Sequence, residues 1–305
     1  MATIPAGGAV WNVSNRQSRR RVSLKMKIFL AMVASAGFGG WWLVYGGEDA
    51  PATGAVGQAL TVSASQSAGL DGTAAVAELR RVLLDAQAKL ESVPLMSAVF
   101  QKQERIGDKL QPVNVMELKV RRTPLTVYMK WHEPETGQQI MWQDGLHDNK
   151  ILVSPAGWKR KVMPLVKIEP TSDMAMAVSK RPVMNAGIWT FTERLMSLID
   201  EELLRDPAVK ITMTDGVAIS GRACRQFKFE HAAPSSIVQF QNFTIFFDDV
   251  LGVPVACEHH RWVVDGPAPK AQLEESYLFR DLTLNAPLTD ADFDHQNPAL
   301  QFGVK

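Results

Sequence analysis

A strict alternation of apolar and polar side chains between Met116 and Pro134 constrains this chain more than any other feature. Met116, Leu118 and Val120 occupy one set of alternate positions, and charged residues occupy the other set. The apolar side resumes after a Thr-Pro corner, at Leu125, Val127, Met129 and Trp131. Successive side chains of a strand point to opposite faces of its sheet. The segment therefore predicts two strands that share one buried face and one solvated face.

Short apolar runs bounded by turn signals predict further strands on both sides of this pair. The first group covers residues 99–106, 115–122, 125–132, 139–142 and 151–154, with 162–168 as a further candidate. The second group covers residues 209–214, 224–231, 237–247, 255–264 and 274–284. Connections are mostly local, which is typical of antiparallel sheets that bury one face. We therefore expect an α+β, mainly β fold, built on a curved antiparallel half-barrel sheet of about ten strands.

Two amphipathic helices are predicted beside this sheet, at residues 74–92 and within 173–205. The first places apolar residues on one stripe at helical spacing, namely Val76, Leu79, Leu83, Ala86 and Leu90. The second has a similar stripe, formed by Ile188, Phe191, Leu195, Leu198 and Ile199. Each stripe needs an apolar surface to pack on. We expect both helices to cover the concave side of the sheet, over the apolar face of 116–131.

The N-terminal region is basic and is followed by an uncharged apolar run. Residues 1–27 carry six Lys and Arg and no acidic residue, and residues 28–45 carry no charge. Eighteen uncharged residues are close to the minimum needed to span a bilayer as a helix. Trp41, Trp42 and Tyr45 lie at the far end of this run, where interfacial aromatic residues are expected. This pattern predicts a basic cytoplasmic tail, an inner-membrane anchor and a body in the periplasm.

A cleaved signal peptide is the alternative interpretation of this region, because Ala34-Ser35-Ala36 is a small-residue site after a short apolar stretch. The chain would then be secreted to the periplasm. A nucleic-acid-binding arm explains the basic tail less well. Once the six basic residues of the tail are set aside, the rest of the chain has 27 Lys and Arg against 32 Asp and Glu, and such a mildly acidic body argues against nucleic acid as a partner.

Residues 46–72 separate the apolar segment from the body. They are rich in Gly, Ala, Ser, Thr and Gln, with few charges, and cannot bury enough apolar surface to fold alone. We therefore expect a flexible linker at 46–72 and a single β domain at 73–305.

Five segments of the body carry a resemblance to a known family, namely "QKQERIGDKL" followed by "MELKVRRTPLTVYMKW", then "DMAMAVSKRPVMNAGI", "GRACRQFKFEH" and "DLTLNAPLTDADFDHQNPALQF". In these segments the chain resembles the outer-membrane lipoprotein-sorting superfamily, the LolA/LolB-like fold, and within it a bacterial domain family of unassigned function. The segments extend over most of 73–305 and are structural motifs. The resemblance implies a half-open β-barrel that is closed by helices over a hydrophobic cavity.

This resemblance, together with 13 Met residues, favours a non-enzymatic envelope protein that binds a hydrophobic ligand, either a lipid or lipoprotein acyl chains. The candidate cavity-wall residues are Met116, Leu118, Val120, Val127, Met129, Trp131 and Trp142. The candidate lid residues are Trp189, Leu195 and Ile199. The alternative function is a membrane-tethered interaction or envelope-sensing module with a filled core.

Signals of catalysis and of metal binding are weak in this sequence. It contains no phosphate loop, no dinucleotide fingerprint and no G-x-S-x-G motif. His259 and His260 are neighbours on a predicted strand and point to opposite faces, so they indicate a half-buried and a surface histidine. Asp290, Asp292 and Asp294 lack the glycine and the distal Glu of a calcium loop and indicate a helix-capped turn. We expect no enzymatic activity, no cofactor and no metal.

The last expectation concerns Cys224 and Cys257. In a simple meander they lie on alternate strands, roughly 9–10 Å apart, whereas a disulfide needs Cα atoms within about 7 Å. We therefore expect two free, largely buried thiols.

Overall fold

The structure, a computed structural model, describes residues 62–63, 69–206, 208–234, 240–263 and 269–303. The predicted tail 1–27 and the predicted membrane segment 28–45 lie outside these residues. Within the described ranges, no helix combines the length and the apolar character that crossing a membrane requires. Parts of the predicted linker 46–72 are described. Its residues Val62–Ser63 form β1, which pairs with β9 (Lys210–Ile219).

One antiparallel sheet of thirteen strands contains all the described β structure. Its order is β1-β9-β10-β11-β12-β13-β2-β4-β5-β6-β7-β8, and the two-residue β3 (Lys109–Leu110) pairs with β2. The strands beside β9 are β10 (Arg222–Glu230), β11 (Phe240–Asp248), β12 (Pro254–Val263) and β13 (Lys270–Leu284). Those on the other side are β2 (Leu95–Ile106), β4 (Asn114–Arg121), β5 (Thr126–Glu133), β6 (Gln139–Gln143), β7 (Ile151–Ser154) and β8 (Val166–Ile168). This sheet confirms the predicted mainly β, antiparallel fold.

The sheet consists of two local meanders joined in the middle. We call β9–β13 the long half, because its strands have 9 to 15 residues, and β4–β8 the short half, because its strands shorten from 8 residues to 3. They meet where β13 pairs with β2, for instance with Phe279 opposite Phe100. The difference from the expected ten strands lies in β1, β3 and β8, which are too short to give an alternating pattern.

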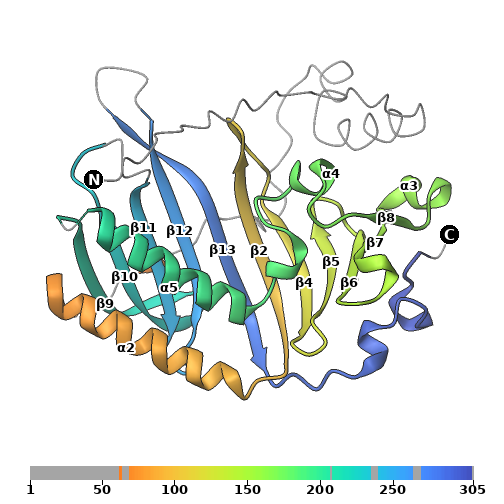
Figure 1. Cartoon of the computed structure of the whole chain (residues 1–305), viewed down its shortest axis with the longest axis horizontal. Helices are drawn as coiled ribbons and strands as arrows, with labels where there is room; N and C mark the ends of the chain where they lie inside the picture. Colours follow the sequence, from red (N-terminus) through yellow and green to blue (C-terminus); the bar gives the residue numbers. More distant parts are fainter. Residues whose placement is uncertain (1–61, 64–68, 207, 235–239, 264–268, 304–305) are drawn as a thin grey trace, which may run out of the picture. The chain divides into compact units, whose positions relative to one another are not determined.

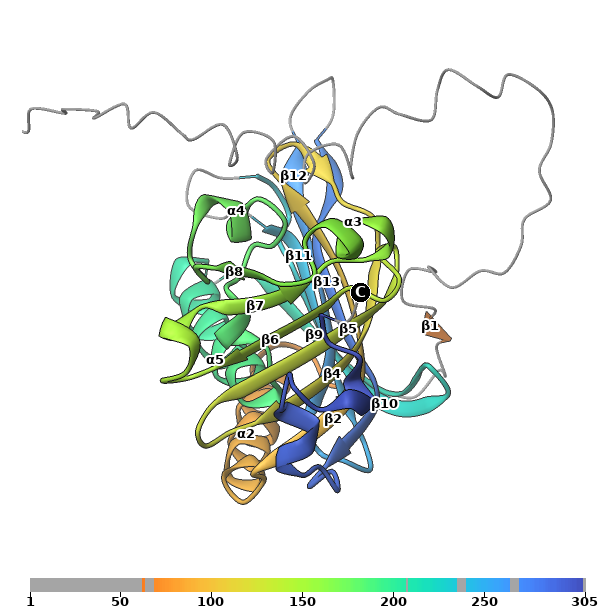
Figure 2. The ribbon, with the colours of Figure 1, turned by 90° about the vertical axis from the view of Figure 1, so that its right-hand side faces the viewer.

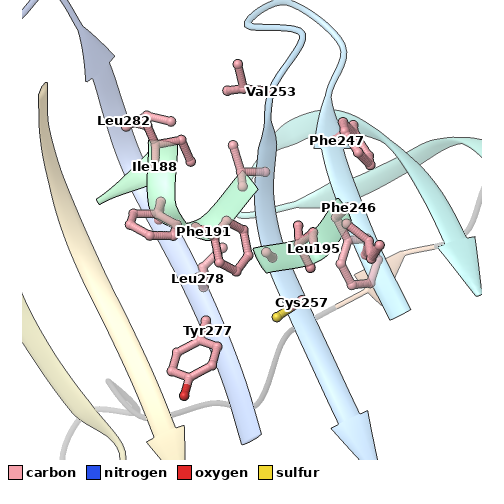
Figure 3. Close-up of a cluster of buried hydrophobic side chains, with 14 of the residues drawn as sticks. Ile188, Phe191, Leu195, Phe246, Phe247, Val253, Cys257, Tyr277, Leu278 and Leu282 are labelled. Carbon is pink, nitrogen blue, oxygen red and sulfur yellow. The ribbon is translucent and has the colours of Figure 1, made fainter. Parts of the chain in front are cut away.

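Two long helices cover one face of the long half (Figures 1 and 2). Helix α2 (Gly72–Glu91) packs on α5 (Ile188–Arg205) and on β9, and α5 packs on β12. Four of the five residues of the predicted α2 stripe are buried, namely Leu79, Leu83, Ala86 and Leu90, whereas Val76 is half-buried. Figure 3 shows Phe191 and Leu195 of α5 directed at the strands that carry Leu278 and Cys257. Fully burying one such aliphatic or aromatic side chain contributes about 1.5–3 kcal/mol, so these helices depend on the sheet for their stability.

The expected helix 173–205 is divided into three pieces. They are α4 (Asp173–Met176), the 3-10 turn η2 (Val183–Asn185) and α5. Pro182, which precedes η2, has no amide hydrogen to continue a helix. Gly187 has a φ of +155°, and a Cβ there would lie 3.2 Å from the ring of Trp189. The backbone therefore turns sharply before α5 begins.

The predicted strand 162–168 is wrong over its first part. Residues Gly157–Val162 form the short helix α3, and the strand β8 begins only at Val166. The run Lys159-Arg160-Lys161 has no apolar alternation, and Arg160 binds backbone carbonyls of Pro155 and Gly137. These contacts hold the segment in a helical turn against the β5–β6 connection.

The C-terminal segment covers the opposite face of the short half. It contains the 3-10 turns η3 (Asp290–Phe293) and η4 (Pro298–Leu300). Phe293 and Phe302 pack with Tyr128, Met141 and Leu152, which point away from the main core. The same strands therefore contribute to two apolar clusters, one on each face, and the predicted solvated face of 116–131 is wrong where the C-terminal segment buries Tyr128.

Candidate functional site

The structure brings all ten predicted wall and lid residues into one apolar cluster. Nine of them are at most 7% exposed, namely Met116, Leu118, Val120, Val127, Met129, Trp142, Trp189, Leu195 and Ile199. Trp131 packs at the edge of the cluster, half-buried, and its indole N–H donates to Asn114 Oδ1 at 2.9 Å. In this conformation these side chains form a filled core.

The cover over the apolar face of 116–131 differs from the expected one. The bodies of α2 and α5 lie over the long half, whereas η2 contacts β5 and the start of α5 reaches β2. The backbone amide of Ile188 donates to the sulfur of Met96 at 3.3 Å. The expectation that both helices cover 116–131 is therefore wrong, because α2 finds its apolar surface on α5 and β9.

Trp189 joins the two covering helices. Its indole N–H donates to the carbonyl oxygen of Leu90 at 3.0 Å, and Arg122 donates to the same oxygen at 3.2 Å. The last carbonyls of a helix have no partner within the helix, so these two donors satisfy the end of α2. Moving α5 away from α2 would break the bond from Trp189.

A cavity of about 160 Å³ lies beneath the N-terminal half of α5, at the junction of β2 and β13. Phe100, Phe191 and Phe279 form its aromatic part, with ring centroids of adjacent pairs 4.7 and 5.2 Å apart. Polar groups also line it, among them Arg181, Arg194, Asn185, Thr190 and Tyr277. An apolar cavity of about 150 Å³ holds benzene, while pockets for drug-sized ligands measure about 300–1,000 Å³. As it stands, this cavity accommodates a ring or a few methylene groups.

A buried carboxylate holds both arginines at this cavity. Glu275 on β13 has a side chain that is 3% exposed and accepts two hydrogen bonds from Arg181, at 2.7 and 2.8 Å. Arg194 donates to the same carboxylate at 3.0 Å, and His259 Nδ1 lies 3.0 Å from it. Two permanent cations thus face one anion. The buried Nε of Arg181 has no hydrogen-bond partner among the described residues.

These contacts govern the protonation of the cluster. Burial opposes ionisation of Glu275, but the contact with His259 and the positive charges of Arg181 and Arg194 outweigh it and hold its pKa well below the usual range. Burial raises the pKa of the Tyr277 hydroxyl, and the carboxylates of Glu275 and Glu104 raise it further. Tyr277 therefore stays protonated and donates to Glu104.

Glu104 on β2 forms the second buried carboxylate of the region. It accepts hydrogen bonds from the ammonium group of Lys102 at 3.0 Å and from the backbone amide of Lys180 at 3.2 Å. Lys102 also donates to Ser179 at 2.9 Å. Since Glu104 has its own cation in Lys102, the surplus positive charge remains at Arg181 and Arg194.

The sequence did not single out this charged cluster. The one signal in the sequence was the position of Glu275 on its strand. Glu275, Tyr277 and Phe279 occupy alternate positions of β13, so Glu275 points to the same buried face as the two aromatic residues. A carboxylate on the buried face of a strand requires partners. Its partners Arg181 and Arg194 come from the helical insertion, 94 and 81 residues away in the chain, and no local pattern connects them.

The paired histidines point to opposite faces, as predicted. The burial predicted for them is wrong in one respect, because His259 is fully buried against Glu275 while His260 is half-buried beside Asn242. Among the described residues, no group of three His, Cys, Asp or Glu is placed to hold a metal ion. The predicted helix-capped turn at 290–294 is confirmed, since Thr289 and Asp292 form a capping box.

The two cysteines occupy the positions that the meander requires. Cys224 lies on β10 and Cys257 on β12, with β11 between them, and both are buried and free. Burial and the carboxylates of Asp248 and Asp249 raise the pKa of Cys224 to about 12. Burial raises the pKa of Cys257 well above its usual value. Neither thiol is therefore poised as a nucleophile.

Comparison with known proteins gives one family match and several distant structural likenesses. The family model described as "Protein of unknown function (DUF1571)" matches residues 93–302. No curated protein matches the chain. The lipoprotein LppX of Mycobacterium tuberculosis is 13% identical, with a TM-score of 0.39 over 71% of this chain and 97% of that chain.

Two further solved structures are similarly distant. A putative outer membrane lipoprotein-sorting protein domain from Vibrio parahaemolyticus is 9% identical, with a TM-score of 0.31 over 72% of this chain and 97% of that one. A LolA superfamily protein from Nitrosomonas europaea is 10% identical, with a TM-score of 0.28 over 70% of this chain and 96% of that one.

Proposed function

Because the chain belongs to the DUF1571 family of proteins of unknown function, we propose its function from its own geometry: it is a non-enzymatic envelope protein that binds a hydrophobic ligand. The family membership confirms the predicted resemblance to a bacterial domain family of unassigned function. The ligand is an acyl chain of a lipid or lipoprotein, and it enters beneath α5. The observation that carries this proposal is the cavity with three phenylalanines and two arginines.

The chemistry of this cavity fits an amphipathic molecule. Phe100, Phe191 and Phe279 offer aromatic surface, which an apolar chain covers favourably. Arg181 and Arg194 share the single carboxylate of Glu275, which leaves one positive charge for an anionic head group. Guanidinium groups bind carboxylates and phosphates with paired N–H donors.

A whole acyl chain needs more room than the cavity offers, so binding includes a displacement of α5. Some of the contacts that resist this motion are soft, although the ion pair between Arg194 and Glu275 also holds α5 to β13. The soft contacts include the hydrogen bond from Trp189 to Leu90, the contact of Ile188 with the sulfur of Met96, and the partly buried Met184 and Met196. Methionine adapts its shape to different neighbours, which suits a wall that repacks around a ligand. The buried wall residues Met116, Val127, Met129 and Trp142 would then line the widened space.

Photo-crosslinking of the full chain with a diazirine fatty acid tests this function. The expected adducts lie on peptides from 181–205 and 269–284, and unlabelled fatty acid competes better than the fatty alcohol of equal length. Arg194→Gln should weaken the labelling several-fold. Arg80→Gln is the matched control, because Arg80 also lies on a covering helix and also pairs with a carboxylate, that of Asp200, at 2.6 Å. Adducts scattered over the surface, or equal competition by the alcohol, would contradict the proposal.

The filled core favours a second function, an interaction or envelope-sensing module tethered by the N-terminal segment. Its specific support is the burial of nine predicted wall and lid residues together with a cavity well below lipid size. In that case the full chain carries no lipid when isolated. In-cell crosslinking would then recover a protein partner whose capture depends on residues 1–72. Recovery of a bound acyl chain without any partner would exclude it.

A further inference from the structure

The free edge of the short half displays apolar side chains to solvent beside positive charges. Eight large hydrophobic side chains of the described residues are exposed, and three of them lie within eight positions of each other, namely Trp158, Val162 and Leu165. Trp158 is 61% exposed and Val162 is 63% exposed. They stand four residues apart on α3, so they share one side of the helix. We call these three residues, together with Lys161 and Lys167, the α3 patch.

The charges of the segment that carries these side chains have one sign. Residues 155–168 contain four basic residues and no acidic residue. Lys161 and Lys167 are exposed with the apolar residues. Lys167 has a long contact of 3.7 Å with the exposed Asp148, and Lys159 lies 3.5 Å from Glu135. Pairs of this kind in solvent contribute little and are easily exchanged for another anion.

The patch is held rigidly in place. Arg160 points away from it and binds the carbonyl oxygen of Pro155 at 3.0 Å and that of Gly137 on the β5–β6 connection. On its two sides, β7 and β8 pair with each other. The exposure of Trp158 and Val162 is therefore a property of the folded edge, and it does not arise from an unfolded loop.

Exposed tryptophan beside lysines matches the chemistry of a lipid surface. Tryptophan and aliphatic side chains insert at the level of the head groups, and neighbouring lysines bind anionic lipids. A soluble protein partner would more often require an extended apolar groove or an acidic peptide, and a patch of three apolar residues is small for such an interface. Charge complementarity thus selects an anionic membrane as the occupant.

We propose that the α3 patch docks the domain onto an anionic membrane surface, with Trp158, Val162 and Leu165 inserted between head groups and Lys161 and Lys167 against lipid phosphates. This docking site is separate from the cavity beneath α5 and does not depend on the ligand proposed for that cavity. It would orient the free edge of the short half toward the bilayer.

The test measures the depth of a single label, because the predicted membrane segment 28–45 could bind vesicles by itself. The full chain with Val162→Cys carries an environment-sensitive fluorophore, and vesicles contain nitroxide-labelled lipid with either phosphatidylglycerol and phosphatidylcholine or phosphatidylcholine alone. The matched control is Val250→Cys, an 81% exposed residue on the β11–β12 turn next to Asp248 and Asp249. The unsubstituted chain reports any labelling of Cys224 and Cys257.

We expect strong quenching at position 162 in phosphatidylglycerol vesicles and little quenching at position 250. Each lysine contributes about fivefold to docking, so replacing both Lys161 and Lys167 by Gln should lower the ratio of docked to undocked label about 25-fold. Equal quenching at the two positions, or quenching at 162 that is independent of lipid charge, would overturn the proposal. A change in the label that grows with protein concentration without lipid would assign the patch to a second copy of the chain, and would overturn it as well.

Discussion

The two halves of the sheet use similar residues in different ways. In the long half, strands of 9 to 15 residues pack phenylalanines such as Phe227, Phe229 and Phe243 at 0–1% exposure beneath α2 and α5. In the short half, the strands shrink from 8 residues to 3, and the edge beside them exposes Trp158 and Val162. Apolar side chains thus stabilise the fold in both halves, but only the edge of the short half also exposes a group of them that is available for contact.

The seam between the halves carries the charges. Glu275 on β13 and Glu104 on β2 meet Arg181 and Lys102 where the two meanders join, beside the cavity. The long half, with α2 and α5 on it, is therefore the rigid part of the fold, which we call the frame. The seam and the short half hold the groups that could contact a ligand or a lipid surface.

The two halves should differ most in the loss of stability that follows when a buried phenylalanine is replaced by alanine. We expect Phe227→Ala to lower the free energy of unfolding by about 4 kcal/mol, since the frame leaves a cavity that cannot collapse. Phe302→Ala, in the five-residue cluster behind the short half, should cost about half as much because the terminal segment can shift. Urea unfolding followed by tryptophan fluorescence measures both. Equal losses would show that the two halves are packed alike.

The next effect concerns the seam. We expect Glu275→Gln to cost about 3 kcal/mol, because it leaves Arg181 and Arg194 without a buried counter-charge. The control Glu258→Gln, at a half-buried carboxylate on β12, should cost no more than about 1 kcal/mol.

The ionisation of Glu275 also predicts how the stability of the fold depends on pH. The pKa of this carboxylate is lower in the folded state than in the unfolded state, so its stabilisation is complete above the unfolded value of about 4 and is lost as the pH falls toward the folded value. Urea unfolding between pH 6 and pH 3 should therefore show a steeper loss of stability for the parent chain than for Glu275→Gln. Parallel pH profiles would mean that Glu275 is not ionised in the fold.

The reactivity of the two cysteine thiols tests whether the long half opens locally in the native protein. Cys224 and Cys257 should react slowly with a thiol reagent at pH 8, because both are buried and their thiolates are disfavoured. Under denaturing but non-reducing conditions two thiols should be counted. A count of zero would require a disulfide and contradict the meander. Fast labelling of the native chain would show that the long half opens locally.

We expect the smallest effect on stability from a substitution at the edge of the short half. Trp158→Gln should change the free energy of unfolding by less than about 0.5 kcal/mol, since the side chain is 61% exposed. The same substitution should reduce the quenching at position 162 in anionic vesicles. A large loss of stability would mean that Trp158 supports the short half and is not held for contact.

Elements with a regular period could be predicted from the sequence. The stripes of α2 and α5 and the alternation of Met116 to Trp131 reappear in the structure, and the order of β10, β11 and β12 places the cysteines on alternate strands. These features depend on local periodicity, which a single chain reveals. The predicted wall and lid residues lie together in one apolar cluster, because burial follows from the same patterns, and their role in ligand binding stays a prediction.

Features that depend on distant partners could not be predicted. No local sequence pattern connects Glu275 with Arg181. No local pattern indicates either that α2 packs on β9, or that η2 is the segment that contacts β5. The predicted strand 162–168 begins too early, because Val162, the last residue of α3, is β-branched and apolar like Val166 and Ile168 of β8. Whether a buried wall surrounds a cavity or a core also depends on tertiary packing, which a pattern of residues leaves open.

The pairing of β13 with β2 has a consequence for folding kinetics. Each meander can form from contacts between neighbours in the chain, whereas the seam joins the first long strand to the last one, as in the pair Glu104 and Glu275. Contacts of such high sequence separation slow folding, since a long loop must be closed before they are gained. A chain that emerges from a ribosome or a translocation channel therefore cannot complete its central sheet until β13 has appeared. Until then the edges of β2 and β12 stay unpaired, and this interval is when the protein is most exposed to aggregation.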